Sequence, residues 1–136
     1  MSVYIDTSAF LAIFNSEDQR HEAAVRTWLR LIDDQELIVT ANYVVVETTA
    51  LLQSRHGIPA VRRLAEEMLP VVLIEWVDPS THTAAMSAVL ASSGNRSASF
   101  VDCISFEIIR KSHIANVFAY DRHFKNRGFD VIGESL

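Results

Sequence analysis

The chain has 136 residues, of which 49% are hydrophobic and 21% are charged. This length fits one domain with one core, and the apolar content is too high for a disordered protein. The formal net charge of -5 excludes a generally basic nucleic-acid binder, so any polyanionic substrate must be held locally or through a metal ion. We therefore predict that residues 1–136 form a single domain.

The cysteine count and the N-terminus favour a reducing compartment. Cys103 is the one cysteine in the sequence, which excludes an intramolecular disulfide. The chain begins Met-Ser-Val-Tyr-Ile-Asp, with an acid where a signal peptide has basic and then apolar residues. No apolar run approaches the length of a membrane span. We expect a cytoplasmic protein with no membrane partner.

The first half of the chain alternates short β-prone runs with apolar residues at helical spacing. Thr40 or Asn42 is expected to cap the third helix, Gly57 to end it, and Pro70 to close the fourth. In chain order, the expected elements are strand 3–5, helix 9–14, helix 20–33, strand 37–39, helix 42–56 and helix 60–69.

The second half continues the same alternation. Asp78-Pro79-Ser80 is a helix-start signal, and residues 93–97 form the clearest loop. In chain order, the expected elements are strand 71–77, a helix ending near 92, helix 100–112, strand 117–120, a polar turn at 122–127 and a possible edge strand at 129–132. Strands separated by helices predict an α/β fold, with a mainly parallel sheet of four or five strands covered on both faces.

Four acidic residues lie on or just past apolar segments: Asp6, Glu47, Asp102 and Asp121. Carboxylates avoid apolar surroundings unless something neutralises them, and a divalent cation does so for several at once. Asp6 and Asp121 end expected strands, where sites form in parallel sheets. Glu47 and Asp102 lie on the apolar sides of their helices. Carboxylate ligands suit Mg²⁺ or Mn²⁺.

Each acid also has a structural explanation. Asp6 and Asp121 could be N-caps of the segments that follow, and Asp102 could be an acid in the first turn of its helix, where the helix dipole stabilises a negative charge. Glu47 could pair with a buried arginine, but it is mid-helix and cannot cap. Taken together, the four residues indicate an acidic metal site in an α/β domain.

At these residues the sequence resembles the PIN domain family, in particular the toxin ribonucleases of bacterial VapBC toxin–antitoxin pairs. The resemblance covers nearly the whole chain and implies a three-layer α/β/α sandwich with the acids gathered in one pocket. The matching segments are Tyr4-Ile5-Asp6-Thr7-Ser8-Ala9, Val46-Glu47-Thr48, Ser99-Phe100-Val101-Asp102-Cys103 and Phe118-Ala119-Tyr120-Asp121-Arg122-His123-Phe124.

The resemblance implies a metal-dependent endoribonuclease that acts on tRNA, rRNA or another RNA. Asp6, Glu47, Asp102 and Asp121 carry over as ligands for one or two Mg²⁺ or Mn²⁺ ions, with Glu47 either a ligand or the base that orients water. Ser8 matches a hydroxyl position that supports the first aspartate, or is simply a polar turn residue. Water as the nucleophile predicts 5′-phosphate and 3′-hydroxyl products.

Basic residues near the acids are candidates for RNA phosphate contacts. Arg122, His123, Lys125 and Arg127 follow Asp121 directly, although a solvated turn explains them equally well. Arg96, in the loop before Asp102, is a further candidate. Arg55, Arg62 and Arg63 are expected on the ordinary surface.

The resemblance also implies two protein partners. An apolar groove of the early helices, with Phe10, Phe14 and Trp28, would support a homodimer and receive the C-terminal segment of an antitoxin, unless these residues are simply core. An antitoxin arginine among the four acids would block metal binding.

Two other functions remain open from the residues. A strand ending in Asp6-Thr7 is found in haloacid-dehalogenase-type phosphatases, but these place a second acid two residues on, where this chain has Ser8. A non-catalytic PIN-like module for RNA binding or assembly would keep the four acids as structural residues.

Overall fold

A parallel five-stranded sheet lies at the centre of the computed structural model, which describes residues 1–92 and 97–134. The strands are β1 (Ser2–Ile5), β2 (Leu37–Ala41), β3 (Val72–Glu75), β4 (Asn116–Phe118) and β5 (Val131–Ile132). Their order is β3-β2-β1-β4-β5, and every neighbouring pair is parallel. The chain therefore builds outward from β1 in both directions.

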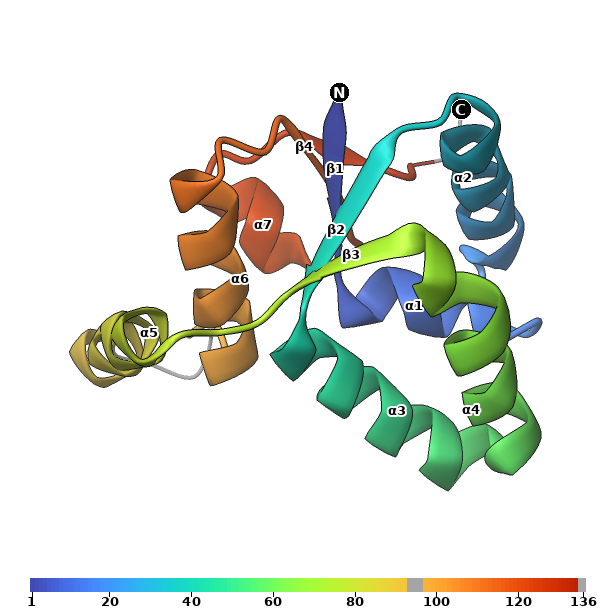
Figure 1. Cartoon of the computed structure of the whole chain (residues 1–136), viewed down its shortest axis with the longest axis horizontal. Coiled ribbons are helices and arrows are strands. Elements are labelled where there is room, and N and C mark those ends of the chain that lie inside the picture. Colours follow the sequence, from blue (N-terminus) through green and yellow to red (C-terminus); the bar gives the residue numbers. More distant parts are fainter. Residues whose placement is uncertain (93–96, 135–136) are drawn as a thin grey trace.

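Helices cover both faces of this sheet. They are α1 (Thr7–Phe14), α2 (His21–Asp33), α3 (Asn42–His56), α4 (Ile58–Arg63), α5 (Pro79–Ala91), α6 (Phe100–Lys111) and α7 (Arg122–Asn126). Right-handed crossovers that proceed in opposite directions from β1 place the early and late helices on opposite faces. Figure 1 shows α6 and α7 on one side of the strands, and α1, α2 and α4 on the other. The predicted three-layer α/β fold is confirmed.

Buried polar side chains connect β1 to its surroundings. The Tyr4 hydroxyl forms a 2.7 Å hydrogen bond with Ser105 Oγ on α6, and Thr40 Oγ1 donates to the Ile5 carbonyl at 2.7 Å. Thr40 therefore does not cap α3. Asn42 does not cap it either, because its Oδ1 accepts from the Val77 backbone N–H at 2.8 Å. The N-cap of α3 is Ala41, so the helix starts without a side-chain cap.

Two segments differ from the predicted elements near the middle of the chain. The helix expected over 60–69 is split into α4, a π-helical turn at Leu64–Met68 and a 3₁₀ turn at Leu69–Val71. Pro70 explains why the helix widens into a π-helical turn and then ends, since proline lacks an N–H and its ring crowds the carbonyl one turn earlier. Gly57 ends α3 as predicted, with a φ of 81° that few other residues adopt.

The C-terminal region differs in one way that matters for the site. The strand expected over 117–120 ends at Phe118, and the polar turn expected at 122–127 is the helix α7. Asp121 thus lies three residues beyond β4 and is the N-cap of α7, where its carboxylate accepts from the His123 backbone N–H. Among the described residues, no helix is both long and apolar enough to cross a membrane.

Candidate active site

Asp6 is the most buried carboxylate of the site. It caps α1, and its Oδ2 accepts from the Ser8 backbone N–H at 3.1 Å and from Ser8 Oγ at 2.7 Å. The residue is 3% exposed. Burial raises the pKa of Asp6 to about 7; the hydrogen bonds from Ser8 oppose the shift, and the charges of Asp102 and Asp121 add to it.

The Ser8 hydroxyl joins the two chain segments that cross at the carboxyl edge of the sheet. While it donates to Asp6, it accepts from the backbone N–H groups of Tyr120 at 2.9 Å and of Asp121 at 3.3 Å. The segment after β4 is thereby held beside the end of β1. Ser8 does contact the first aspartate, as the family resemblance implied.

Asp102 enters the site from α6 through a capping box. Its Oδ2 accepts from the Ser99 N–H, and Ser99 Oγ accepts from the Asp102 N–H, both at 3.1 Å. Burial raises the pKa of Asp102, with Asp121 as the second cause, while the contacts with Ser99 and His123 lower it. Asp102 is therefore a first-turn acid of α6, as one of the two explanations expected, and its charge is also felt by another carboxylate, Asp121.

His123 was missed as a member of this cluster. Its Nδ1 lies 2.6 Å from Asp121 Oδ1 and 3.5 Å from Asp102 Oδ2. One ligand atom from each of these three residues lies within 4.8 Å of the others. The sequence placed His123 with the basic residues around it, and only its position two residues after a capping aspartate could have indicated the contact.

Glu47 completes one pocket with the three aspartates. It lies half-buried in the second turn of α3, which starts where β2 ends. All four carboxylates line a pocket of about 360 Å³, together with Ser8, Leu11, Leu51, Ser99 and His123 among others. Four distant segments are thus brought to one place at the carboxyl edge of the sheet.

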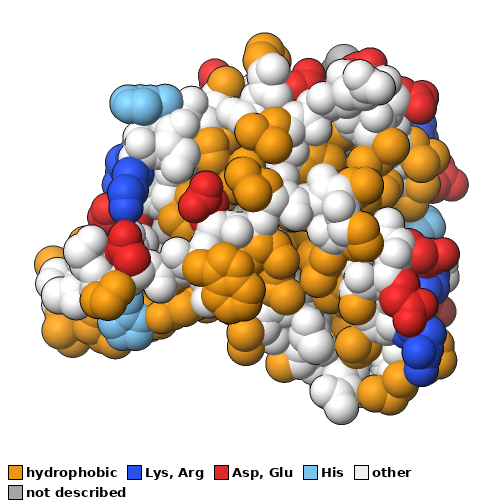
Figure 2. All heavy atoms as spheres, in the orientation of Figure 1, with side chains coloured by type: hydrophobic (Ala, Val, Ile, Leu, Met, Phe, Trp, Pro, Cys, Tyr) orange, Lys and Arg blue, Asp and Glu red, His pale blue; other side chains and the backbone are white. Residues whose placement is uncertain are grey.

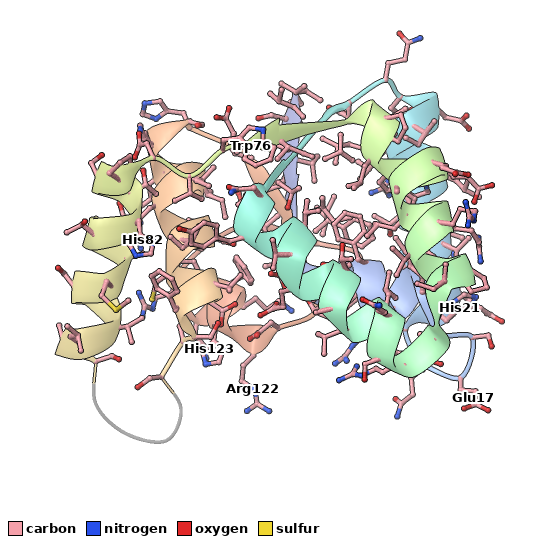
Figure 3. All side chains as sticks on the ribbon, turned by 60° about the horizontal axis from the view of Figure 1, so that its bottom comes forward. Glu17, His21, Trp76, His82, Arg122 and His123 are labelled. Atoms are coloured by element: carbon pink, nitrogen blue, oxygen red, sulfur yellow. The ribbon has the colours of Figure 1, made fainter. Side chains whose placement is uncertain are left out.

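The basic residues predicted to contact RNA phosphates have different surroundings in the structure. Lys125 pairs with Glu134 at 3.7 Å, and the Arg127 guanidinium lies over the Phe106 ring at 4.9 Å. Figure 3 shows the Arg122 side chain extending into open space beside α7. Arg122 therefore keeps an exposed charge near Asp121, while Arg96 lies outside the described residues.

The donors in this pocket fit a divalent cation. They are carboxylate oxygens, with one imidazole beside them, and hard cations such as Mg²⁺ and Mn²⁺ prefer oxygen ligands. Burial is the main cause of the raised pKa values of Asp6 and Asp102, and repulsion from neighbouring carboxylates adds to it. A cation held by Asp6, Asp102, Asp121 and Glu47 would relieve that repulsion.

The profile of the PIN domain family matches residues 3–130. The chain belongs to this family. It is 35% identical over 128 residues to the 23S rRNA-specific endonuclease VapC20 of Mycobacterium tuberculosis, an alignment that covers 93% of this chain and 95% of the relative. The family predicted from four short motifs is confirmed, and the similarity supports the predicted class of protein, a PIN-domain ribonuclease toxin.

Solved structures agree on the fold. The crystal structure of Mycobacterium tuberculosis VapC20, described as a sarcin-ricin loop cleaving toxin, has a TM-score of 0.80 at 33% identity, over 93% of this chain and 95% of that one. FitAcB from Neisseria gonorrhoeae has a TM-score of 0.62 at 14% identity, over 96% of each chain, and shows the fold alone. Membership of the PIN family removes the phosphatase alternative.

Proposed function

We propose that the protein, as one domain, is a metal-dependent endoribonuclease and the toxin of a toxin–antitoxin pair. The observation that carries this proposal is the convergence of Asp6, Glu47, Asp102 and Asp121 on one pocket at the carboxyl edge of the sheet. The similarity to an RNA endonuclease over nearly the whole chain supports it.

The four carboxylates would hold one or two Mg²⁺ or Mn²⁺ ions, with Asp6, Asp102 and Asp121 as ligands. A bound ion would lower the pKa of water and neutralise charge on the phosphorane oxygens. The reaction is hydrolysis: the water oxygen bonds to phosphorus and the bond to O3′ breaks. The products are then a 5′-phosphate and a 3′-hydroxyl, because the ribose 2′-OH takes no part.

The residues around the site have separate tasks in this proposal. Ser8 orients Asp6 and fixes the chain at Asp121 through three hydrogen bonds. Glu47 is a further ligand or the base that orients the attacking water. In the structure His123 lies between Asp102 and Asp121, and an ionised carboxylate only accepts hydrogen bonds, so Nδ1 carries the hydrogen in the Asp121 contact.

The first substrate to test is the large-subunit rRNA in the bacterial cytoplasm. The relative named above is specific for 23S rRNA and cleaves the sarcin-ricin loop. Proteins reach bases most easily in RNA loops, where they are unstacked. We extend this substrate class to the present chain because the alignment covers 93% of it.

We also propose a homodimer and an antitoxin as partners. The groove expected at the early helices is not the surface used here, because its three aromatic residues pack in or against the core: Phe10, Phe14 and Trp28. Large apolar side chains are instead exposed around β3, where Leu73 is 47% and Trp76 is 75% exposed, and Val46 on α3 is 68% exposed. Figure 2 shows apolar side chains gathered over the middle of the face along which β3 runs. Such surface is enriched at protein interfaces.

The test is cleavage of total bacterial RNA by the purified protein with Mg²⁺, Mn²⁺ or EDTA. Cleavage that needs metal, with 5′-phosphate ends mapped by ligation, is expected for the wild type and should be lost in Asp6→Asn. Cleavage in EDTA, or full activity of a folded Asp6→Asn protein, would overturn the proposed site. No cleavage by protein shown to be free of antitoxin would favour the non-catalytic alternative.

A further inference from the structure

A second pocket lies next to the acidic one and is lined by two arginines. It has a volume of about 300 Å³ and shares Ser8, Leu11 and Asp121 with the candidate active site. Its other lining residues come from the α1–α2 connection, the end of α3 and the segment after β4, and they include Arg20, Arg55, His56 and Tyr120. A ligand in this pocket would therefore be continuous with one bound at the acids.

We propose that this pocket binds an RNA phosphate next to the bond that is cleaved, with Arg20 and Arg55 as its ligands. The proposal rests on the nuclease function proposed above and identifies where that site holds its substrate. Arginine matches a phosphate with parallel N–H donors, and a net acidic protein needs local arginines to hold RNA.

Arg20 is held in place before any ligand binds. Its guanidinium lies 5.3 Å from the centre of the Tyr120 ring, a cation–π contact. The ring itself is fixed, because the Tyr120 hydroxyl donates to the Gly133 carbonyl at 2.7 Å and the Tyr120 N–H donates to Ser8 Oγ at 2.9 Å. Gly133 has a φ of 107°, and a Cβ there would lie 3.0 Å from the Phe118 ring, so this position requires glycine.

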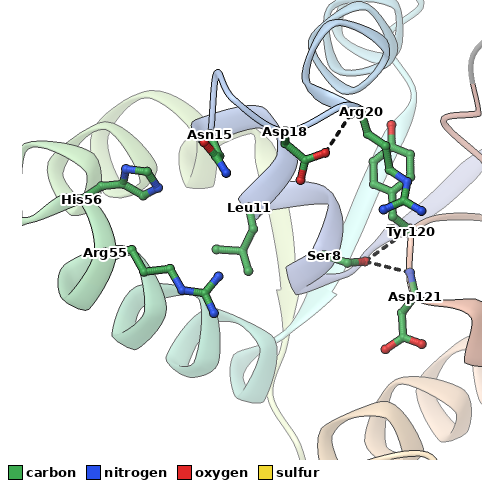
Figure 4. A pocket seen from close by; sticks show the side chains of 9 residues that line it. All are labelled: Ser8, Leu11, Asn15, Asp18, Arg20, Arg55, His56, Tyr120 and Asp121. Atoms are coloured by element: carbon green, nitrogen blue, oxygen red, sulfur yellow. Dashed lines mark hydrogen bonds between the residues drawn. The ribbon is translucent and has the colours of Figure 1, made fainter.

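Arg55 belongs to the same helix ridge as Glu47. Residues 47, 51 and 55 follow one another at intervals of four, so Leu51 and Arg55 extend the row that starts at the acid. Eight residues of helix span about 12 Å, which separates the arginine from the candidate metal ligand. Figure 4 shows the Arg20 guanidinium against Tyr120, and Arg55 reaching from α3 toward the same space.

The two arginines are available to an anion. Within residues 1–92 and 97–134, neither forms a salt bridge with a carboxylate, whereas Arg62 and Arg63 pair with Glu66 and Glu67. Two acids also line the pocket: Asp121, which it shares with the candidate active site, and Asp18, whose Oδ1 accepts from the Arg20 backbone N–H at 2.7 Å. Removing Asp18 should strengthen anion binding, so this variant should change RNA affinity in the direction opposite to that of the arginine variants.

The test compares Arg20→Gln, Arg55→Gln and their double variant with Arg30→Gln/Arg62→Gln, which removes the same charge elsewhere. Binding of a short fluorescein-labelled single-stranded RNA is measured by anisotropy across a KCl series, in an Asp102→Asn background that leaves the RNA intact. Each pocket variant should weaken binding about tenfold and lower the slope of log K against log salt by about 0.7. Asp18→Asn should tighten binding, and the control pair should have little effect.

Cleavage kinetics in the otherwise wild-type protein separate this proposal from the proposed function. The double variant should raise KM about a hundredfold with kcat nearly unchanged, because the contact is made before and during reaction alike. Active wild-type protein with an unchanged KM and salt slope in the double variant would refute the pocket and leave the nuclease intact. If the wild type binds RNA but never cleaves it, and the double variant loses that binding, the pocket is supported and the nuclease function is refuted. If instead an acidic peptide, and not RNA, depends on the two arginines, the pocket is a protein-binding site and the proposal is wrong.

Discussion

The buried charge of Asp6 should make the metal-free protein less stable than an asparagine variant. Asn accepts the same cap hydrogen bonds from Ser8 but carries no charge. The pKa of Asp6 in the fold is about 7, against an ordinary value of 3.8, a difference of about 3 pH units. At about 1.4 kcal/mol per unit, the ionised carboxylate costs about 4 kcal/mol of folding free energy.

The sign of the pH dependence follows from these two values. Between pH 4 and 7 the folded state binds the proton that the unfolded state has released, so the wild type loses stability as the pH rises. Asp6→Asn avoids that loss. Its advantage should therefore be small near pH 4, grow through pH 7 and stay constant above it. For a chain of 136 residues, about 4 kcal/mol corresponds to a melting temperature difference on the order of 10 °C.

The assay is thermal and urea unfolding of both proteins in EDTA from pH 4.5 to 8.5. Asp78→Asn is a matched control, since Asp78 caps α5 but is exposed. The Thr81 backbone N–H holds the pKa of Asp78 below its usual range, so this variant should gain nothing from the loss of charge at pH 8. A stability difference for Asp6→Asn that does not change with pH, or a less stable variant at pH 8, would refute the reasoning.

Three further predictions concern metal binding, the hydrogen bonds of Ser8 and RNA binding. Mn²⁺ at a hundred times its Kd should stabilise the wild type by about 2.7 kcal/mol, and a melting temperature that does not move would contradict a site. Ser8→Ala should cost about 1–3 kcal/mol in urea unfolding and slow RNA cleavage, because the Tyr120 N–H loses its acceptor and Asp6 loses a donor. Arg122→Ala should weaken RNA binding and reduce its salt slope by about 0.7; an unchanged slope would return Arg122 to the ordinary surface.

The fold was predictable because each strand of this chain is short, apolar and followed by a turn or a helix. That pattern allows a parallel sheet with helices on both faces and little else. The same logic places Asp6 and Asp121 at one edge, since the carboxyl ends of parallel strands meet there. Glu47 could be found because a mid-helix acid beside Val44 and Leu51 has no capping role.

The features that the sequence did not predict depend on a very short helix and on contacts between distant segments. Helix α7 has five residues, too few for periodicity to reveal, and only its cap at Asp121 was visible. The position of His123 depends on that cap. Arg20 and Arg55 are exposed and 35 residues apart, so no pattern in the sequence connects them; the pocket exists because α1, α3 and the segment after β4 meet.

The sequence left open whether three aspartates are metal ligands or residues of a helix start, as N-caps for Asp6 and Asp121 and as a first-turn acid for Asp102, but the two roles are compatible. Asp6 and Asp121 each cap a helix in the structure, and Asp102 completes the capping box at the start of α6, where Ser99 is the N-cap. Each of the three uses one carboxylate oxygen to accept a backbone hydrogen bond. The second oxygen is not needed for the cap. A cap also fixes the direction of its side chain, and three fixed carboxylates around one pocket are what a cation with strict geometry requires. The helix starts therefore orient the candidate metal ligands, and replacing any of the three by a residue that neither caps nor carries charge should harm folding and metal binding together.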